Sequence, residues 1–254
     1  MIKEIIEKRI EESNITTYGI VKFGSKENLE KLQKGQIYCR NLEFYKSIEH
    51  KDKPFFDNNE GLSAIYQNDQ ISIKIGPVDG KEIILNKDKG LVGAVKMGYN
   101  FSSPVFCTFA INSGDWNCAI SDNNYDDFIE SIRPKDELTK FGEYACVFMN
   151  GAEFNKRLSK ACKDSSVSVE HGYVHYVNFK EVSGRIPEEY IGFVKDISFK
   201  DESEYRYMFF GNELNDPFLL NVGDLSDITQ IISYEDFIKG LGVDFSKENV
   251  LDNS

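Results

Sequence analysis

The residues best suited to chemistry lie in a short charged segment near position 200. Glu202, Glu204 and Arg206 are spaced two apart. Side chains two apart on a β-strand point to the same face, so a strand here would present all three together. A carboxylate in that position can stabilise an oxocarbenium-like centre or accept a hydrogen bond from a ribose hydroxyl. A solvated strand edge with paired charges is the simpler interpretation of the same pattern.

A second candidate follows the first predicted strand, in the sequence Lys22-Phe23-Gly24-Ser25. The strand would carry Lys22 to a turn, and Ser25 would cap a helix over residues 26–34. Free backbone N–H groups and the helix dipole at such a position favour an anionic or carboxamide-bearing ligand. Taken alone, a capped helix beside a solvated lysine is the simpler explanation.

The spacing of the histidines and cysteines favours neither a metal site nor disulfide bonds. His171 and His175 are four apart, but no third ligand lies near them in the sequence, and an open zinc site needs three. The five cysteines are odd in number, widely spaced and without a C-x-x-C pair. We therefore expect reduced thiols, no metal and a cytoplasmic location.

The elements that must position these residues are mostly short strands. Apolar and β-branched runs predict strands, and apolar residues at helical spacing predict helices. The predicted strands are 18–23, 36–40, 62–66, 71–75, 82–85, 91–96, 105–110, 144–149, 173–179, 203–210, 218–221 and 228–232. The predicted helices are 26–34, 125–132, 152–162 and 234–240, and residues 43–60 are expected to form a long loop. Many short strands with a few helices favour an α+β fold with a mainly antiparallel sheet.

The sequence predicts one domain, with a helix before it and a short tail after it. Isoleucines at positions 2, 5, 6 and 10 share one helical face, which predicts an amphipathic helix within residues 1–17. A single α+β domain is expected over 18–246 and a frayed tail over 247–254. No run of 18 apolar residues exists, and the charged N-terminus lacks the apolar core of a signal peptide, so we expect no membrane partner.

The charge of the chain argues against nucleic-acid binding through general attraction. The net charge is −12, and residues 187–254 hold 15 acids and 5 bases, which is −10 of that total. An acidic protein of this kind needs a local basic patch to hold phosphates. The one candidate is a helix face with Lys156, Arg157, Lys160 and Lys163, for which a solvated face is the simpler interpretation.

Three motifs together resemble those of a large family of uncharacterised bacterial and phage proteins. The first is 18–40, a strand with a basic and an aromatic residue before a short helix that ends in glycine. The second is the Cys-Thr-Phe strand 105–110, followed by Trp116. The third runs from Lys195 to the Glu-x-Glu-Tyr-Arg segment that ends at Arg206. The layout is similar to the ADP-ribosyltransferase fold, which implies a split, mainly antiparallel sheet with short helices.

The resemblance implies a role for each candidate residue. Glu204 would be the catalytic carboxylate, with Glu202 as the alternative, and Arg206 would orient it or pair with pyrophosphate. The residues implied to bind NAD are Lys22, Phe23, Ser25, Tyr45 and Thr108. Among these, Lys22 would grip NAD, Ser25 would support its nicotinamide–ribose end, and Tyr45 would stack on nicotinamide.

The implied activity is cleavage of the nicotinamide–ribose bond of NAD and transfer of ADP-ribose to a macromolecular acceptor, as in toxins and antiviral defence proteins. The acceptor would be a protein or a nucleic acid, with an antitoxin or regulatory partner, and no metal is required. Lys22 stands where His or Arg is usual and lacks the planar guanidinium fork. Two alternatives therefore stay open: a non-catalytic binding module of the same fold and an NAD glycohydrolase.

Overall fold

The computed structural model describes residues 2–12, 15–47, 57–78, 81–99, 102–114, 116–212 and 214–243. The fold is mixed α+β with mostly antiparallel sheets, as the short strands predicted. An eight-stranded sheet forms its centre, in the order β14-β2-β7-β1-β8-β15, with β13 pairing β7 and β9 pairing β13. Its strands are β1 (Thr17–Gly24), β2 (Gln36–Asn41), β7 (Pro104–Asn112), β8 (Tyr144–Phe148), β9 (Ser168–Tyr173), β13 (Glu204–Phe210), β14 (Phe218–Asn221) and β15 (Thr229–Ser233).

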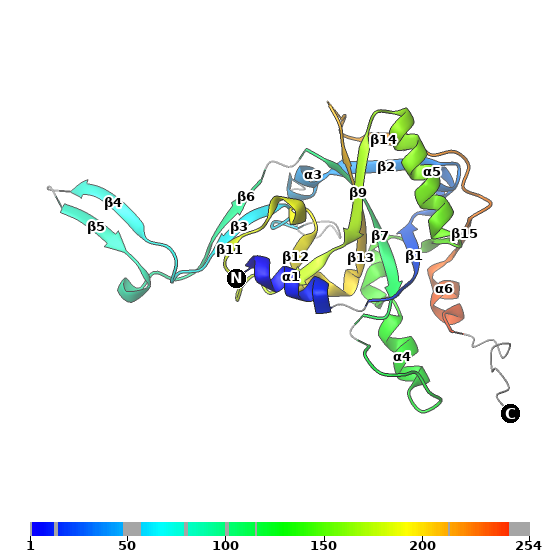
Figure 1. Cartoon of the computed structure of the whole chain (residues 1–254), viewed down its shortest axis with the longest axis horizontal. Helices are drawn as coiled ribbons and strands as arrows, with labels where there is room; N and C mark the ends of the chain where they lie inside the picture. Colours follow the sequence, from blue (N-terminus) through cyan, green and yellow to red (C-terminus); the bar gives the residue numbers. More distant parts are fainter. Residues whose placement is uncertain are drawn as a thin grey trace.

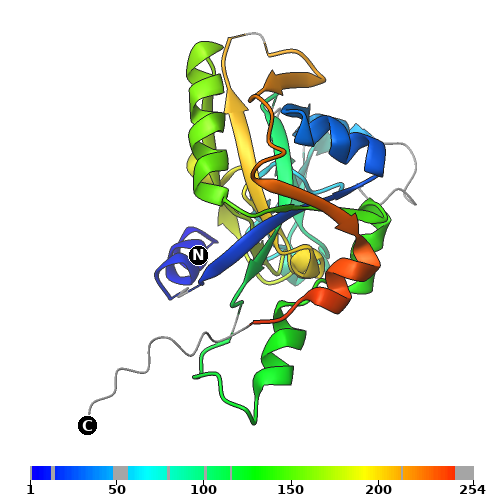
Figure 2. The same ribbon diagram turned by 90° about the vertical axis from the view of Figure 1, so that its right-hand side faces the viewer.

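Helices cover both faces of this sheet. The central strand β7 is apolar along most of its length because both of its faces are buried. One face packs against α2 and α5, and the other packs against α4 and α6. Figure 2 shows α5 alongside the sheet and α4 and α6 at its lower end. The helices are α1 (Ile2–Glu12), α2 (Lys26–Gln33), α3 (Leu42–Ser47), α4 (Tyr125–Ile132), α5 (Gly151–Asp164) and α6 (Tyr234–Gly240).

Short strands and turns form a smaller unit beside the main sheet. Buried Ile2 and Ile6 of α1 pack into its apolar core, as the amphipathic pattern predicted. Its strands are β3 (Leu62–Tyr66), β6 (Val95–Gly98) and β11 (Gly184–Arg185) in one sheet, and β10 (His175–Val177) parallel to β12 (Val194–Asp196) in another. The 3-10 helices in the described part of the chain are η1 (Lys87–Lys89), η2 (Asp136–Phe141), η3 (Glu188–Tyr190) and η4 (Ile197–Glu202).

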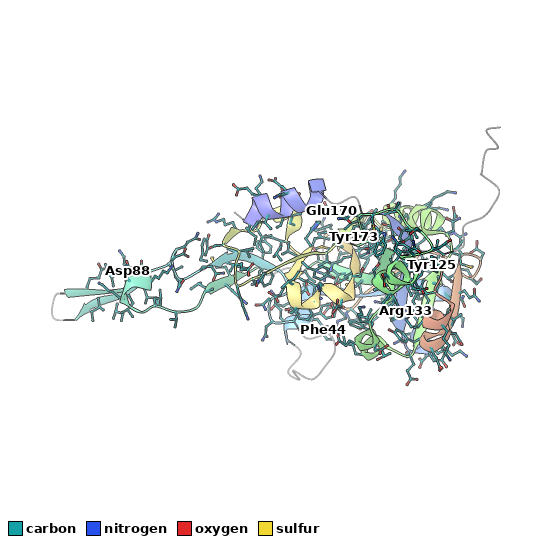
Figure 3. The ribbon with its side chains drawn as sticks, turned by 90° about the horizontal axis from the view of Figure 1, so that it is seen from below. Phe44, Asp88, Tyr125, Arg133, Glu170 and Tyr173 are labelled. Carbon is teal, nitrogen blue, oxygen red and sulfur yellow. The ribbon has the colours of Figure 1, made fainter. Side chains whose placement is uncertain are left out.

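A two-stranded hairpin, β4 (Ile73–Val78) and β5 (Lys81–Leu85), extends from this smaller unit. Residues 71–92, which contain it, are called the arm. Figure 1 shows the arm projecting away from the body of the molecule. In Figure 3, the labelled Asp88 lies on the arm, far from Phe44 and Tyr125 on the body.

Several predicted boundaries are wrong. The loop expected over 43–60 begins as α3, and its residues 48–56 lie outside the described part of the chain, as does the tail 247–254. The strand expected over 173–179 is two strands, because the chain leaves β9 at Tyr173 to pair β10 with β12. The strand expected over 91–96 starts at Val95. Within the described residues, no helix is long and apolar enough to cross a membrane.

Candidate functional site

Strand pairing places Lys22 and Glu204 on opposite faces of the main sheet. Glu204 of β13 and Val21 of β1 both pair with Phe109 of β7, so these side chains share a face. Lys22 follows Val21 and therefore points to the other face. There its Nζ lies 5.1 Å from the centre of the Phe106 ring and donates a 2.6 Å hydrogen bond to a backbone carbonyl of β7.

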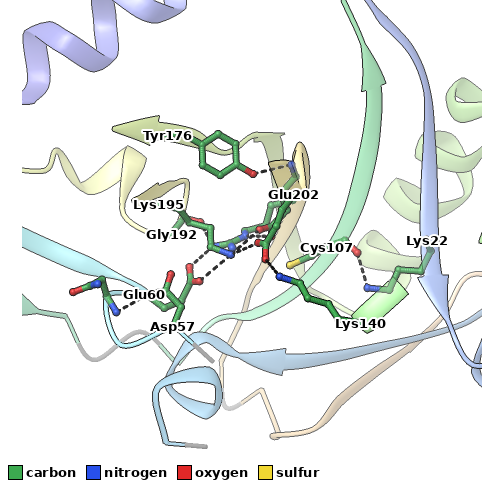
Figure 4. A network of polar contacts seen from close by, with 12 residues as sticks. Lys22, Asp57, Glu60, Cys107, Lys140, Tyr176, Gly192, Lys195 and Glu202 are labelled. Atoms are coloured by element: carbon green, nitrogen blue, oxygen red, sulfur yellow. Dashed lines mark hydrogen bonds and ion pairs between the residues drawn. The ribbon is translucent and has the colours of Figure 1, made fainter. Parts of the chain in front are cut away.

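On the Glu204 face, five side chains form a buried ionic cluster (Figure 4): Glu60, Lys195, Glu202, Glu204 and Arg206. Arg206 is its centre and is 2% exposed. Its Nε lies 2.7 Å from Glu204 Oε1, and its Nη1 lies 2.7 Å from Glu60 Oε1 and also donates to the carbonyl of Gly192. The guanidinium therefore joins two carboxylates from segments far apart in the sequence.

Lys195 provides the second cation of the cluster. Its Nζ lies 2.7 Å from Glu202 Oε2, 3.3 Å from Glu204 Oε2 and 3.8 Å from Glu60 Oε2. Glu202 also forms an ion pair with Lys140, whose Nζ lies 3.1 Å from Glu202 Oε1 and whose side chain is 35% exposed. The cluster thus ties β12, β13, η4 and the turn before β3 to one another.

The charges set the protonation of the cluster. Burial alone would raise the pKa of Glu204, but Arg206 and Lys195 outweigh it and hold the pKa well below its usual range. Burial alone would lower the pKa of Lys195, but Glu204, Glu60 and Glu202 raise it well above its usual value. Both groups are therefore charged at neutral pH, and each is neutralised by its neighbours.

Asp57 lies beside the cluster and is incompletely paired. It is 4% exposed, its Oδ1 accepts a 2.8 Å hydrogen bond from the Asn59 backbone, and its Oδ2 is buried with no hydrogen-bond partner. Burial, and then the nearby charge of Glu60, raises its pKa to about 6. With Asp57, four carboxylates therefore lie in or beside a cluster that holds two buried cations, Lys195 and Arg206.

Three aromatic or sulfur-bearing groups border the cluster. Tyr45 of α3 and Cys107 both pack against a small apolar core. Burial raises the pKa of the Cys107 thiol to about 12, so it is protonated and hydrogen-bonds the Glu204 carboxylate. Tyr176 contributes its hydroxyl, which accepts a 2.9 Å hydrogen bond from the backbone N–H of Glu204. Of the predicted NAD-binding residues, Tyr45 lies close enough to Glu204 for the carboxylate to add to the rise that burial causes in the pKa of its hydroxyl.

The other predicted NAD-binding residues, Phe23, Ser25 and Thr108, make contacts within the fold. Phe23 packs in the core between the sheet and helices α4 and α6. Ser25 caps α2, as predicted, by accepting a hydrogen bond from Asn28 N. Thr108 is buried and donates a 3.0 Å hydrogen bond to the Tyr205 carbonyl, on the same face as Lys22.

One residue of the predicted charged strand, Glu202, does not lie on the strand. Glu202 ends η4, and Ser203 then adopts φ +40°, so the strand starts at Glu204 and the two-residue period does not include Glu202. Glu202 nevertheless belongs to the cluster, through its ion pair with Lys195. Sequence reasoning missed Asp57 and Glu60, whose one local signal is their position just before the apolar strand β3.

One cavity in the described part of the chain has a lining that includes none of the cluster residues. A cavity of about 510 Å³ between α4 and the segment after α6 is lined by Tyr125, Asp126, Asp127, Ile129, Glu130, Arg133 and Leu241. None of the predicted site residues lines it. His171 hydrogen-bonds the Tyr205 hydroxyl at 2.6 Å, and no three His, Cys, Asp or Glu residues of the described chain are grouped to hold a metal ion.

No family model matches the chain, and neither a curated protein nor a solved structure matches it significantly.

Proposed function

We propose that the protein is a non-catalytic binding module that docks on a protein partner through one face of its arm. The observation that carries this proposal is the apolar face of the β4–β5 hairpin. Ile73 pairs with Leu85, and Ile75 pairs with Ile83, so the four side chains share a face. The three isoleucines are 43–45% exposed, which is high for aliphatic side chains aligned on one strand face.

The other face of the hairpin differs in character. It presents Lys74 and Glu82, whose charged groups are 3.8 Å apart, together with Ile84, which pairs with Lys74. A strand pair that is wholly apolar on one face and carries its charges on the other is the pattern of a hairpin that packs its apolar face against another surface. An isolated two-stranded hairpin is at best marginally stable in water, so a partner on this face would also stabilise the arm.

Exposed apolar side chains continue at the base of the arm. Val92 is 83% exposed, and Val95, Met97 and Tyr99 are each 45–50% exposed. Scattered exposed apolar residues are ordinary on a protein surface, but a concentration of them on a projecting segment is typical of an interaction site. Together with the hairpin face, they give the arm and its base several exposed apolar side chains that a partner can cover.

The ionic cluster is better suited to holding the fold than to catalysis. Both of its buried cations contact carboxylates of the cluster, and Lys22 lies on the other side of the sheet. Removing one partner of a buried ion pair typically costs about 3–5 kcal/mol. We therefore assign the cluster the role of fixing the smaller unit, which carries the arm, to the main sheet.

The arm is tested by affinity purification from lysate of the native cells. We expect Ile75→Lys combined with Ile83→Lys to lose the partner protein that the wild type retains. Lys74→Ala, on the opposite face of the same hairpin, is the matched control and should retain it. If the double variant retains the same proteins as the wild type, the arm is not the docking element.

ADP-ribosyl transfer from NAD is the second candidate function. It is favoured by Glu204, an ionised carboxylate beside Tyr45, together with the motif resemblance. NAD at 100 times its dissociation constant would stabilise the fold by about 2.7 kcal/mol. Under our proposal, millimolar NAD causes no thermal shift and no nicotinamide is released. Nicotinamide release that Glu204→Gln abolishes would favour the transferase or, without an acceptor, the glycohydrolase.

A further inference from the structure

We infer that the outer edge of β9 is a second docking site, at which an extended basic segment of a partner protein joins the main sheet as an additional strand. The site belongs to the main sheet and does not depend on the arm. Three observations carry the inference: the backbone groups that β9 directs outward, the contrast with the other two ends of the sheet, and the side chains beside the edge.

The backbone of β9 pairs with β13 at alternate residues. Just past β9, the N–H of Val174 donates a 3.0 Å hydrogen bond to the carbonyl of Glu204, the first residue of β13. Hydrogen-bonded and non-hydrogen-bonded pairs alternate along an antiparallel ladder, so the N–H and C=O groups of Val169, His171 and Tyr173 point away from β13. Within the described residues, no backbone group pairs with them. The edge therefore offers three donors and three acceptors to a partner.

The other two ends of the main sheet, β14 and β15, are protected. The carbonyl of Thr229 in β15 is covered by α2, because Gln33 Nε2 donates to it at 3.2 Å. At the opposite end, β14 has four residues and directly follows Pro217. Short edge strands, proline and lysine are features by which natural sheets discourage the addition of a strand. By contrast, β9 has six residues, neither lysine nor proline, and a regular register with β13. Among the ends of this sheet in the described chain, β9 is therefore the open one.

The edge favours an occupant that is extended in conformation and basic in charge. Outward N–H and C=O groups on alternate residues are matched by another extended backbone. Glu170 is the one residue of β9 with a charged side chain at neutral pH, and it is exposed. A lysine or arginine opposite Glu170 on the added strand would pair with it. The net charge of −12 attracts a basic segment and opposes the approach of a second copy of the chain.

Aromatic rings lie beside the edge on the opposite face from Glu170. His171 and Tyr173 share that face because the side chains of neighbouring strand residues alternate. The ring centres of Tyr173 and Tyr205 are 5.2 Å apart in an edge-to-face contact, and His171 Nδ1 lies 2.6 Å from the Tyr205 hydroxyl oxygen. These contacts hold both rings where an added strand would place every second side chain. The expected segment therefore alternates basic residues with apolar or aromatic ones.

The test selects a phage-displayed library of random peptides, each of about ten residues, on the full chain. We expect the selected peptides to alternate basic with apolar or aromatic residues. They should bind His171→Pro about tenfold more weakly than the matched variant His171→Ala, since both lack the ring but only the proline lacks the outward N–H. Proline is tolerated in an edge strand where the N–H faces solvent, and circular dichroism checks that both variants fold.

Hydrogen exchange followed by NMR locates the bound peptide. In the free protein, the amides of Glu170 and Gly172 should be protected by β13. The amides of Val169, His171 and Tyr173 should exchange freely and become protected when the peptide binds. Failure to select a peptide, equal binding by the two His171 variants, or protection confined to other amides would overturn the inference. A wild type that light scattering shows to be a dimer, and that His171→Pro makes monomeric, would also overturn it, because a second copy would then occupy the edge.

Discussion

At the scale of single residues, burial decides what the charged side chains do. Glu204 and Arg206 have residue types that suit a catalytic site, but in the folded chain they are paired with each other and with Glu60 and Lys195. Asp57 is the exception, because one of its oxygens has no partner. These two situations predict opposite effects of substitution.

Replacement of Asp57 should stabilise the protein at neutral pH. Its folded pKa of about 6 lies above its usual value of 3.8, so the folded state holds the proton more tightly and stability falls as pH rises between these values. A rise of this size corresponds to at most about 3 kcal/mol. Urea unfolding should show Asp57→Asn to be more stable than the wild type by about 1–3 kcal/mol at pH 7.5, and by less at pH 5. An equal difference at both pH values would contradict the assigned pKa.

Replacement of Arg206 should have the opposite effect. Arg206→Met leaves Glu60 and Glu204 buried without their main cation, which should lower the free energy of unfolding by about 3–5 kcal/mol. Lys239→Met is the control, because it removes an exposed ion pair with Glu235 and should cost less than about 1 kcal/mol. Similar losses in the two variants would mean that the cluster does not hold the fold.

Part of this residue-level arrangement could be predicted from the sequence. A period of two placed Glu204 and Arg206 on one face, since alternation is a property of the strand itself. The acids Asp57 and Glu60 could not be predicted, because they lie more than 140 residues away from β13 and reach the cluster through tertiary packing. The period failed at Glu202 because a 3-10 turn precedes the strand.

At the scale of elements, the sequence predicted the strands and helices with strong local signals. The first strand, the Ser25 cap and helix α2 follow their predicted order, and the hairpin β4–β5 lies close to its predicted position. The relative faces of β1 and β13 could not be derived, because they depend on the register of both strands with β7. That register separates Lys22 from Glu204.

The cap of α2 gives a prediction at this scale. Ser25→Ala removes the hydrogen bond to Asn28 N and should lower the free energy of unfolding by about 0.5–1 kcal/mol. Asn150→Ala, which removes the equivalent cap of α5, should cost a similar amount. Urea unfolding measures both. A Ser25→Ala variant of wild-type stability would show that the serine is not needed for the helix.

At the scale of the whole molecule, the arm is separable from the body. Ile73 and Leu85 are directly paired, so two glycines can replace the hairpin residues 73–85. We expect the shortened protein to unfold with a midpoint close to that of the wild type, because no other element packs on the apolar face of the hairpin in the described chain. It should also lose the partner. A large loss of stability would mean that the arm is part of the body's core.

The most direct test of the docking face is cross-linking inside cells, with a photoreactive benzophenone side chain placed at Ile75 or, as the control, at Lys74. These neighbours lie on opposite faces of one strand, so they differ in little except the direction in which they point. We predict a discrete cross-linked protein band from position 75 and none from position 74. Equal cross-linking from the two positions, or none from either, would contradict docking through the apolar face.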